Sequence, residues 1–208
     1  MVKDFIKDGE VLCDMFCGVG PLAVRVAAKQ PKTRVLANDL NPVGVEYLKK
    51  NIKLNKCGDR VIPFNMDAKK FLRMLVDVTD ESEEKKRVPK EYLKFQHCYM
   101  NLPMLAVEFL DCFIGSFNNA DKTIWQNAEG KYELPLIHVY GFTQVKEEKG
   151  AKKYFTERIQ KAMRYADFKE EDIINFHNIR DVSSSSHMYS TTFRLPEAVA
   201  FSKEPYEL

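Results

Sequence analysis

One short stretch of the chain, VLCDMFCGVGPLAV at residues 11–24, limits the possible folds more than any other. It opens with an apolar run that ends at Asp14, which is typical of a buried strand. Gly18 and Gly20 follow, and glycine lets a backbone turn sharply or approach another group closely. Pro21 then begins an apolar run with helical spacing, at a position where its missing N–H costs nothing. The stretch therefore predicts a strand, a glycine turn and a helix N-terminus, an arrangement that binds cofactors.

Strand-like and helix-like segments alternate along most of the chain. The expected strands fall at 10–14, 34–38, 60–65, 96–100 and 135–141, and the helices at 21–29, 42–55, 67–76, 103–116 and 150–166. Two further strands, near 173–180 and 188–195, have no helix between them. We therefore expect one Rossmann-like α/β domain over residues 1–208. Its sheet has seven strands in all, and they are parallel except for one antiparallel strand near the C-terminus.

Three polar segments interrupt this alternation. Residues 77–94 form a charged insertion that we expect to be a solvated surface excursion. Residues 118–133 form a polar connection that carries the only tryptophan of the chain. Four consecutive serines at 183–186 are typical of a mobile loop between the last two strands.

Composition restricts the class of protein without indicating a partner. The 208 residues are 45% hydrophobic and 30% charged, as in globular domains, and a net charge of +2 indicates neither a nucleic acid nor a membrane. We find no apolar run as long as a membrane span and no signal peptide. The five cysteines form no C-x-x-C pair. We interpret them as small core residues in a reducing compartment rather than as metal ligands or disulfides.

Polar side chains follow the second, third and fourth expected strands. Asp39 comes 25 positions after Asp14, a separation that suits an acidic residue accepting hydrogen bonds from a ribose diol. Asp67 heads a helix, where it can meet an adenine amino group, and Asn101 precedes a leucine and a proline. Because the carboxyl ends of parallel strands share one edge of the sheet, we expect these side chains to surround a nucleoside.

Each of these residues also has an ordinary structural interpretation. Asp39 and Asp67 are equally consistent with helix N-caps, and Asn101 with a turn residue before proline. The nucleoside site is favoured because it explains all three residues together with the glycine turn.

The residues also help to select the cofactor. Ala23 replaces the third glycine of a G-x-G-x-x-G turn, which some dinucleotide sites tolerate, so a nicotinamide dehydrogenase is a distant alternative. Asn-Leu-Pro after the fourth strand is not a dehydrogenase feature. A polar residue followed by proline suits an enzyme that receives a planar nitrogen nucleophile beside a methyl donor.

Four motifs, in order, resemble the tRNA (guanine-37-N1) methyltransferases of archaea and eukaryotes, which are class I S-adenosylmethionine-dependent methyltransferases. The motifs are DMFCGVGP at 14–21, NDLNP at 38–42, NIKLNK at 51–56 and MNLP at 100–103. The resemblance covers nearly the whole chain and implies the class I methyltransferase fold with S-adenosylmethionine as cofactor. The cofactor-binding residues are then Gly18 and Gly20 in the turn, Asp39 and Leu40 at the ribose, Asp67 and Ala68 at the adenine, and Asn101.

The resemblance also implies an activity, methyl transfer to N1 of guanine 37 in tRNA, with Asn101 as a catalytic residue between cofactor and guanine. The sulfonium of the cofactor already activates the methyl group, so no metal is expected. In the family, the general base is a glutamate just upstream of the first strand, and the tRNA-recognition domains also lie upstream. We therefore expect this chain to be a catalytic domain that methylates tRNA poorly by itself.

Two alternatives remain open, a non-catalytic S-adenosylmethionine-binding domain and the related aminocarboxypropyl transferase of wybutosine synthesis. We expect tRNA as the partner, no membrane, and a monomer inside the cell, in the cytoplasm, nucleus or mitochondrial matrix. One group of basic residues is consistent with a stripe facing phosphates, although a solvated helix face is the preferred interpretation. The group consists of Lys146, Lys149, Lys152, Lys153, Arg158, Lys161 and Arg164.

Overall fold

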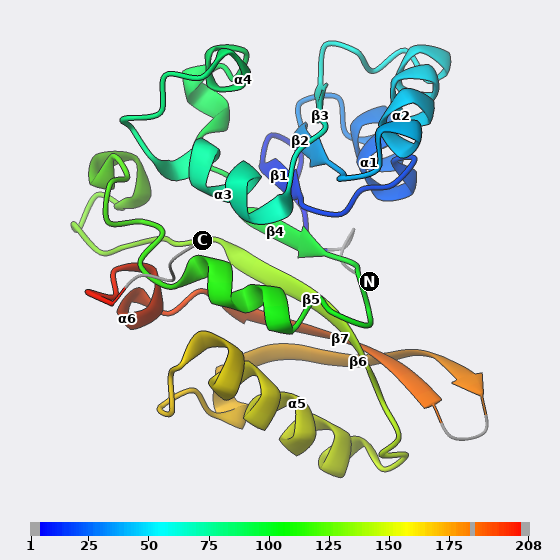
Figure 1. Ribbon diagram of the computed structural model, residues 1–208, viewed down its shortest axis with the longest axis vertical. Coiled ribbons are helices and arrows are strands. Elements are labelled where there is room, and N and C mark those ends of the chain that lie inside the picture. The colour runs from blue at the N-terminus through cyan, green and yellow to red at the C-terminus, as the bar shows by residue number, and fades with distance from the viewer. Residues whose placement is uncertain (1–4, 184–185, 205–208) are drawn as a thin grey trace.

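A seven-stranded sheet forms the centre of the computed structural model, which describes residues 5–183 and 186–204 (Figure 1). Its strands, in the spatial order β3-β2-β1-β4-β5-β7-β6, are β1 Val11–Asp14, β2 Arg34–Asn38, β3 Val61–Phe64, β4 His97–Met100, β5 Leu136–Thr143, β6 Ile173–Ser183 and β7 Ser186–Arg194. β7 runs antiparallel to both β5 and β6, and the other neighbouring strands pair in parallel. The predicted α/β fold, with one antiparallel strand near the C-terminus, is confirmed.

The helices lie at the two ends of the strand order and along both faces. The α-helices are α1 Pro21–Lys29, α2 Pro42–Leu54, α3 Ala68–Val76, α4 Glu83–Lys86, α5 Glu148–Met163 and α6 Glu197–Ala200. The 3-10 helices are η2 Lys90–Tyr92, η3 Glu108–Phe113, η4 Lys122–Trp125 and η5 Glu170–Asp172. Figure 1 shows α1 and α2 beside β1–β3, and α5 beside β5–β7 at the other end of the molecule.

Side chains that alternate along the strands fill two cores, one on each face of the sheet. Leu12 belongs to the core that α1 and α2 cover, whereas Cys13 belongs to the core covered by α3, η3 and α5. Since both faces are covered, all four residues of β1 are buried, and its first three are apolar without alternation. The five cysteines are buried and free, which confirms their interpretation as core residues.

The helix predicted at 103–116 is wrong. The chain makes turns through 103–107 and then the short 3-10 helix η3. Val107, Leu110 and Phe113 recur every third residue and are at most 1% exposed. A 3-10 helix has three residues per turn, so it aligns all three side chains in one row, whereas an α-helix would spread them over about 120°. Packing against the core therefore determines the local conformation here.

The charged insertion at 77–94 lies on the surface, as predicted, but it is fastened to the body. Lys85 Nζ donates hydrogen bonds to the carbonyls of Met74 and Leu75, each at 2.7 Å. These carbonyls belong to the last turn of α3, where backbone acceptors lack helical partners. Arg87 donates to the carbonyl of Pro63 at 3.0 Å. The insertion therefore caps α3 rather than extending freely into solvent.

The loop predicted at 183–186 is shorter than expected. β6 and β7 pair as far as Ser183 and Ser186, so these two residues close the hairpin, and 184–185 lie outside the described residues. The only tryptophan, in the polar connection before β5, is 1% exposed and packs edge-on against Phe95 and Phe117.

Candidate functional site

The carboxyl ends of β1, β2, β3 and β4 meet at one edge of the sheet, where β1 lies between β2 and β4. This is the switch point of strand order, the position at which open parallel sheets bind ligands. The buried side chain of Asn38 fixes three strand ends together. Its amide donates to the carbonyls of Met15 (3.3 Å) and Met66 (3.0 Å) and accepts from the Met66 N–H (3.0 Å).

The glycine turn depends on backbone conformations that other residues rarely adopt. Gly18 and Gly20 have φ values of 53° and 84°. A Cβ on Gly20 would lie 2.4 Å from Leu48 Cδ1, so α2 packs against the turn as closely as glycine allows. The turn is held from the next strand end, because Asp39 Oδ2 accepts a hydrogen bond from the Gly18 N–H at 2.7 Å.

Asp39 is therefore not a helix cap. Its second oxygen accepts from the Asn41 N–H at 2.9 Å, and Asn41 itself caps α2 by accepting from the Val43 N–H at 3.0 Å. Asp67 does cap α3, since its Oδ1 accepts from the N–H groups of Lys69 and Lys70 at 3.0 and 3.2 Å. Both of those bonds go to one oxygen, which leaves Asp67 Oδ2 for a ligand.

A cavity of about 560 Å³ opens at this edge, within the range of small-molecule sites. It is lined by Met15, Phe16, Asp39, Leu40, Asn41, Asp67, Ala68, Asn101, Leu102 and Phe109. The structure thus brings together five predicted site residues, which are Asp39, Leu40, Asp67, Ala68 and Asn101. Gly18 and Gly20 do not line the cavity. They shape the turn beside it, and Asp39 connects the two.

Sequence reasoning missed the aromatic wall of the cavity. The rings of Phe16 and Phe109 meet edge to face, with centroids 5.1 Å apart and an angle of 83°. Phe16 lies inside the DMFCGVGP motif and was open to recognition. Phe109 was hidden because its segment was interpreted as a regular helix. Such a wall suits a flat ring, because aromatic faces and edges pack well against one another.

Two buried oxygens near the cavity lack partners within the described part of the chain, namely Asp14 Oδ1 and Asn101 Oδ1. Asp14 is 1% exposed, and burial raises the pKa of its carboxyl from 3.8 to about 8. The Phe16 N–H opposes this shift by donating to the carboxylate, and the negative charge of Asp39 adds to it. Unpartnered buried polar atoms are costly, so they are uncommon unless a ligand completes them.

No three His, Cys, Asp or Glu side chains in residues 5–183 and 186–204 are grouped so as to hold a metal ion. Within the same residues, none of the helices combines the length and apolar character that crossing a membrane requires.

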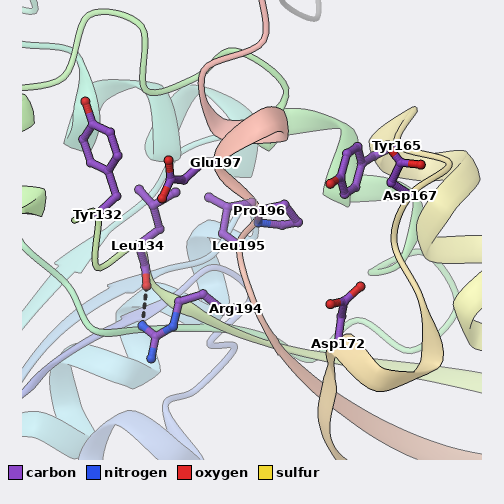
Figure 2. A pocket seen from close by; sticks show the side chains of 9 residues that line it. All are labelled: Tyr132, Leu134, Tyr165, Asp167, Asp172, Arg194, Leu195, Pro196 and Glu197. Carbon is purple, nitrogen blue, oxygen red and sulfur yellow. Dashed lines mark hydrogen bonds between the residues drawn. The ribbon is translucent and has the colours of Figure 1, made fainter.

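A second cavity, of about 310 Å³, lies at the opposite edge of the sheet, next to the start of β5 and the end of β7. Figure 2 shows Arg194 turned toward the carbonyl of Leu134, to which it donates a hydrogen bond. Asp172 is used locally as well, because it accepts from the Lys169 N–H at 2.7 Å. These polar groups serve local structure, and we assign this cavity no role.

Of the basic residues near α5, Arg158 is engaged within the protein. Its guanidinium forms an ion pair with Glu108 and lies over the rings of Tyr154 and Phe155. It therefore fastens α5 to the start of η3, and the other members of the predicted stripe remain without a demonstrated role.

The strand order, with one antiparallel strand and a cavity beside a glycine turn, defines a class I methyltransferase fold. Residues 1–125 match the TRM5/TYW2 methyltransferase domain family, and the chain belongs to this family.

Known proteins with similar sequences or structures include tRNA (guanine(37)-N(1))-methyltransferases and TYW2 proteins. A tRNA (guanine(37)-N(1))-methyltransferase of Phytophthora infestans is 39% identical over 96% of this chain and 41% of its own length. Trm5b from Pyrococcus abyssi superposes with a TM-score of 0.60 at 27% identity, over 93% of this chain and 46% of that protein. TYW2 of M. jannaschii, solved in complex with AdoMet, shares the fold, with a TM-score of 0.59 at 21% identity over 93% and 74% of the two chains. The chain thus spans less than half the length of the first two proteins.

Proposed function

We propose that this chain is the methyl-transfer domain of a tRNA (guanine-37-N1) methyltransferase that uses S-adenosylmethionine. The observation that carries the proposal is the cavity that Asp39, Asp67 and Asn101 line together. Two carboxylates at neighbouring strand ends suit a nucleoside, and an amide oxygen suits a base that offers N–H groups. The name of the Phytophthora infestans relative supports the substrate.

The residues present suit the nucleoside part of S-adenosylmethionine. Asp39 projects from the end of β2 beside the exposed side chain of Leu40, and a carboxylate there accepts the O–H groups of a ribose. Asp67 Oδ2 accepts from an adenine amino group, and Ala68 leaves room for the ring against the aromatic wall. When bound, the cofactor supplies a methyl group that its sulfonium charge activates. The chain therefore has to provide orientation rather than a metal.

Asn101 is the residue that we assign to the target base. Guanine N1 carries a proton, and the nitrogen must also face the methyl group in line for transfer. The side-chain amide of Asn101, which lines the cavity, hydrogen-bonds to the Watson–Crick edge of guanine and holds that edge in place. As the bond from N1 to the methyl carbon forms and the bond from the methyl carbon to sulfur breaks, the N1 proton would pass to a general base, for which the family resemblance implies a glutamate upstream of β1. We assign neither Asp39 nor Asp67 to that role, because backbone N–H groups already bind both carboxylates.

The aminocarboxypropyl transfer reaction is the second candidate, because the family that matches this chain includes TYW2 domains. We favour methyl transfer, since the sequence relative at 39% identity carries the methyltransferase name. The five free cysteines support a reducing intracellular compartment, and we propose tRNA as the partner of a monomeric protein.

One assay tests the function. The protein that contains this chain is incubated with S-adenosylmethionine and unmodified tRNA, and the modified nucleoside is identified by mass. We expect methylguanosine from tRNA with guanine at position 37 and no product from tRNA with adenine there. A nucleoside carrying the aminocarboxypropyl group would favour the second candidate. Absence of cofactor binding in calorimetry would contradict both.

A further inference from the structure

One wall of the cavity is formed by Phe109, which lies on the short 3-10 helix η3. The backbone of this helix is weakly held. Leu110 donates to the carbonyl of Val107, only three residues back, at 3.2 Å, and such bonds have poorer geometry than those of an α-helix. The position of the Phe109 ring therefore depends on contacts from neighbouring elements.

An ion pair joins η3 to α3 beside this ring. Lys69 Nζ donates to Asp111 Oδ2 at 2.7 Å, and the two side chains are only 18% and 20% exposed. The ammonium also lies 5.4 Å from the centroid of the Phe109 ring, within the range of a cation–π contact. Salt and water screen a partly buried pair less than an exposed one, so this pair is an effective restraint on η3.

Lys69 is itself fixed at the edge of the cavity. It is the second residue of α3, and its N–H donates to Asp67 Oδ1 at 3.0 Å. Asp67 and Ala68, the two residues before it, line the cavity together with Phe109. Lys69 therefore connects the side of the cavity that we assign to adenine with the aromatic wall.

Two further contacts restrain the wall. The Phe109 ring meets that of Phe16 edge to face, with centroids 5.1 Å apart. Arg158 of α5 forms an ion pair with Glu108, but the Glu108 side chain is 55% exposed. An exposed pair contributes little, so the pair between Lys69 and Asp111 is the stronger of the two ionic restraints on η3.

We propose that Lys69 is a positioning residue that, through its ion pair with Asp111, holds the Phe109 ring ready for the adenine of the cofactor. The inference rests on the proposed binding of S-adenosylmethionine and adds the residues that shape this wall before the ligand arrives. A side chain that is already ordered loses little conformational freedom on binding, so the ligand binds more tightly.

The test is the Lys69→Met variant of the protein that contains this chain, which keeps an unbranched apolar side chain and removes the ammonium. We expect the dissociation constants of S-adenosylmethionine and of adenosine to rise by the same factor, about fivefold, in calorimetry. Methyl transfer at saturating cofactor should keep the wild-type rate. Lys94→Met is the matched control, since Lys94 pairs with Glu133 at 3.2 Å and neither residue lines the cavity. Both constants should stay at their wild-type values in this control.

A double-mutant cycle separates positioning from a general structural effect. If Lys69 acts through the ring, adding Lys69→Met to Phe109→Ala weakens adenosine binding no further. Multiplicative losses would overturn the inference, as would wild-type affinities in Lys69→Met or a loss confined to S-adenosylmethionine. A slower rate at saturating cofactor with unchanged affinity would also overturn it, because the ring would then act on the target base.

Two further measurements keep the test decisive. If wild-type protein does not bind S-adenosylmethionine, the proposed function fails, and not only the role of Lys69. If Lys69→Met does not fold, Asp111→Ala replaces it, because this variant breaks the same ion pair from the side of η3. The same nonadditivity with Phe109→Ala is then expected, and multiplicative losses would again overturn the inference.

Discussion

The two ends of β4 carry buried polar clusters that differ in how completely their hydrogen bonds are made. The histidine cluster at the start of the strand consists of Glu10, His97, His138 and Thr192. The cavity cluster at its end consists of Asp14, Tyr99, Asn101 and Tyr140. Both clusters are largely removed from water, yet only the cavity cluster leaves oxygens of Asp14 and Asn101 without partners among the described residues.

The histidine cluster forms one directed chain of hydrogen bonds. Glu10 Oε2 lies 2.9 Å from His97 Nε2, and a carboxylate accepts, so this nitrogen carries the proton. His97 Nδ1 then accepts from His138 Nε2 at 3.0 Å, and His138 Nδ1 accepts from the Thr192 hydroxyl at 2.9 Å. Each imidazole in this chain is neutral and uses both of its nitrogens.

The contrast indicates different roles for the two clusters. A network in which each imidazole nitrogen is bonded contributes to stability and fixes the packing of strands. A network with unpartnered oxygens costs stability unless a ligand completes it. We therefore expect changes at the start of β4 to alter folding, and changes at its end to alter binding and catalysis.

The largest expected effect is that of Asp14→Asn on the pH dependence of stability. The cavity cluster and the histidine cluster change stability with pH in opposite directions. Burial raises the pKa of Asp14 from 3.8 to about 8. The folded state therefore keeps a proton that the unfolded chain has released, and stability falls as pH rises from about 4 to 8. Asp14→Asn should remove this loss and raise the free energy of unfolding of the ligand-free protein at pH 8 by several kcal/mol, since one pKa unit corresponds to about 1.4 kcal/mol. Urea unfolding at pH 5 and pH 8 measures it.

The two histidines make the free energy of unfolding change with pH in the opposite direction. Burial lowers the pKa of His97 below 6.5, and that of His138 from 6.5 to about 3. Lys7 and Arg194 add to the shift at His97, and Glu10 opposes it. The unfolded chain binds protons first, so stability falls as pH drops below about 6.5. If Asp14→Asn changed the low-pH limb instead of the limb between pH 4 and 8, the comparison would be wrong.

The next effect is at the centre of the histidine cluster. His138→Ala leaves His97 Nδ1 and the Thr192 hydroxyl without partners at positions that are at most 2% exposed. We expect the free energy of unfolding to fall by about 3 kcal/mol, from the unpartnered groups and the cavity left behind. Denaturant unfolding measures the loss. An unchanged midpoint would show that the chain of hydrogen bonds does not stabilise the fold.

At the other end of β4, Asn101→Ala should act on rate rather than on folding. Asn101 lies after the strand, and its oxygen has no partner to lose. We expect methyl transfer to slow about 100-fold, with nearly unchanged unfolding and cofactor affinity. Single-turnover kinetics and calorimetry check both parts. Equal losses in rate and in cofactor affinity would make Asn101 a cofactor ligand only.

The smallest expected effect is at Asp39, which sharpens the comparison because its carboxylate is bonded before any ligand arrives. Asp39→Asn keeps the shape but places an amide nitrogen near one of the N–H groups of Gly18 or Asn41. We expect S-adenosylmethionine to bind about tenfold more weakly. Calorimetry measures the change, and Asp59→Asn, on an exposed turn away from the cavity, serves as control. An unchanged affinity would remove Asp39 from the site.

The sequence predicted those parts of the fold and site that short-range pattern determines. Apolar runs followed by polar residues located the strands β1 to β4, and Asp39, Asp67 and Asn101 line one cavity because parallel strands end at one edge. The positions of Gly18 and Gly20 relative to the cavity could not be predicted from the sequence. Their turn is confirmed, but the structure places Asp39 rather than the glycines at the cavity.

What the sequence could not show depends on contacts between distant residues. His97 and His138 lie 41 positions apart, and Glu10 and His97 lie 87 apart, so no local pattern connects them. The same holds for Tyr99 and Tyr140, which are adjacent only because β4 and β5 pair. The 3-10 helix η3 was missed because core packing, rather than propensity, selects its period.

Because η3 forms one wall of the cavity, that wall is held by weaker backbone hydrogen bonds than the strands are. Leu110 and Ile114 donate to carbonyls only three residues back, at 3.2 and 3.1 Å, and such bonds have poorer geometry than those of an α-helix. Segments held this way open locally at lower free energy than the strands beneath them. Phe109 belongs to η3, and its ring contacts that of Phe16, which follows β1 at the edge of the sheet. We therefore expect a ligand that packs against Phe109 to reduce amide exchange along η3 before it affects the strands.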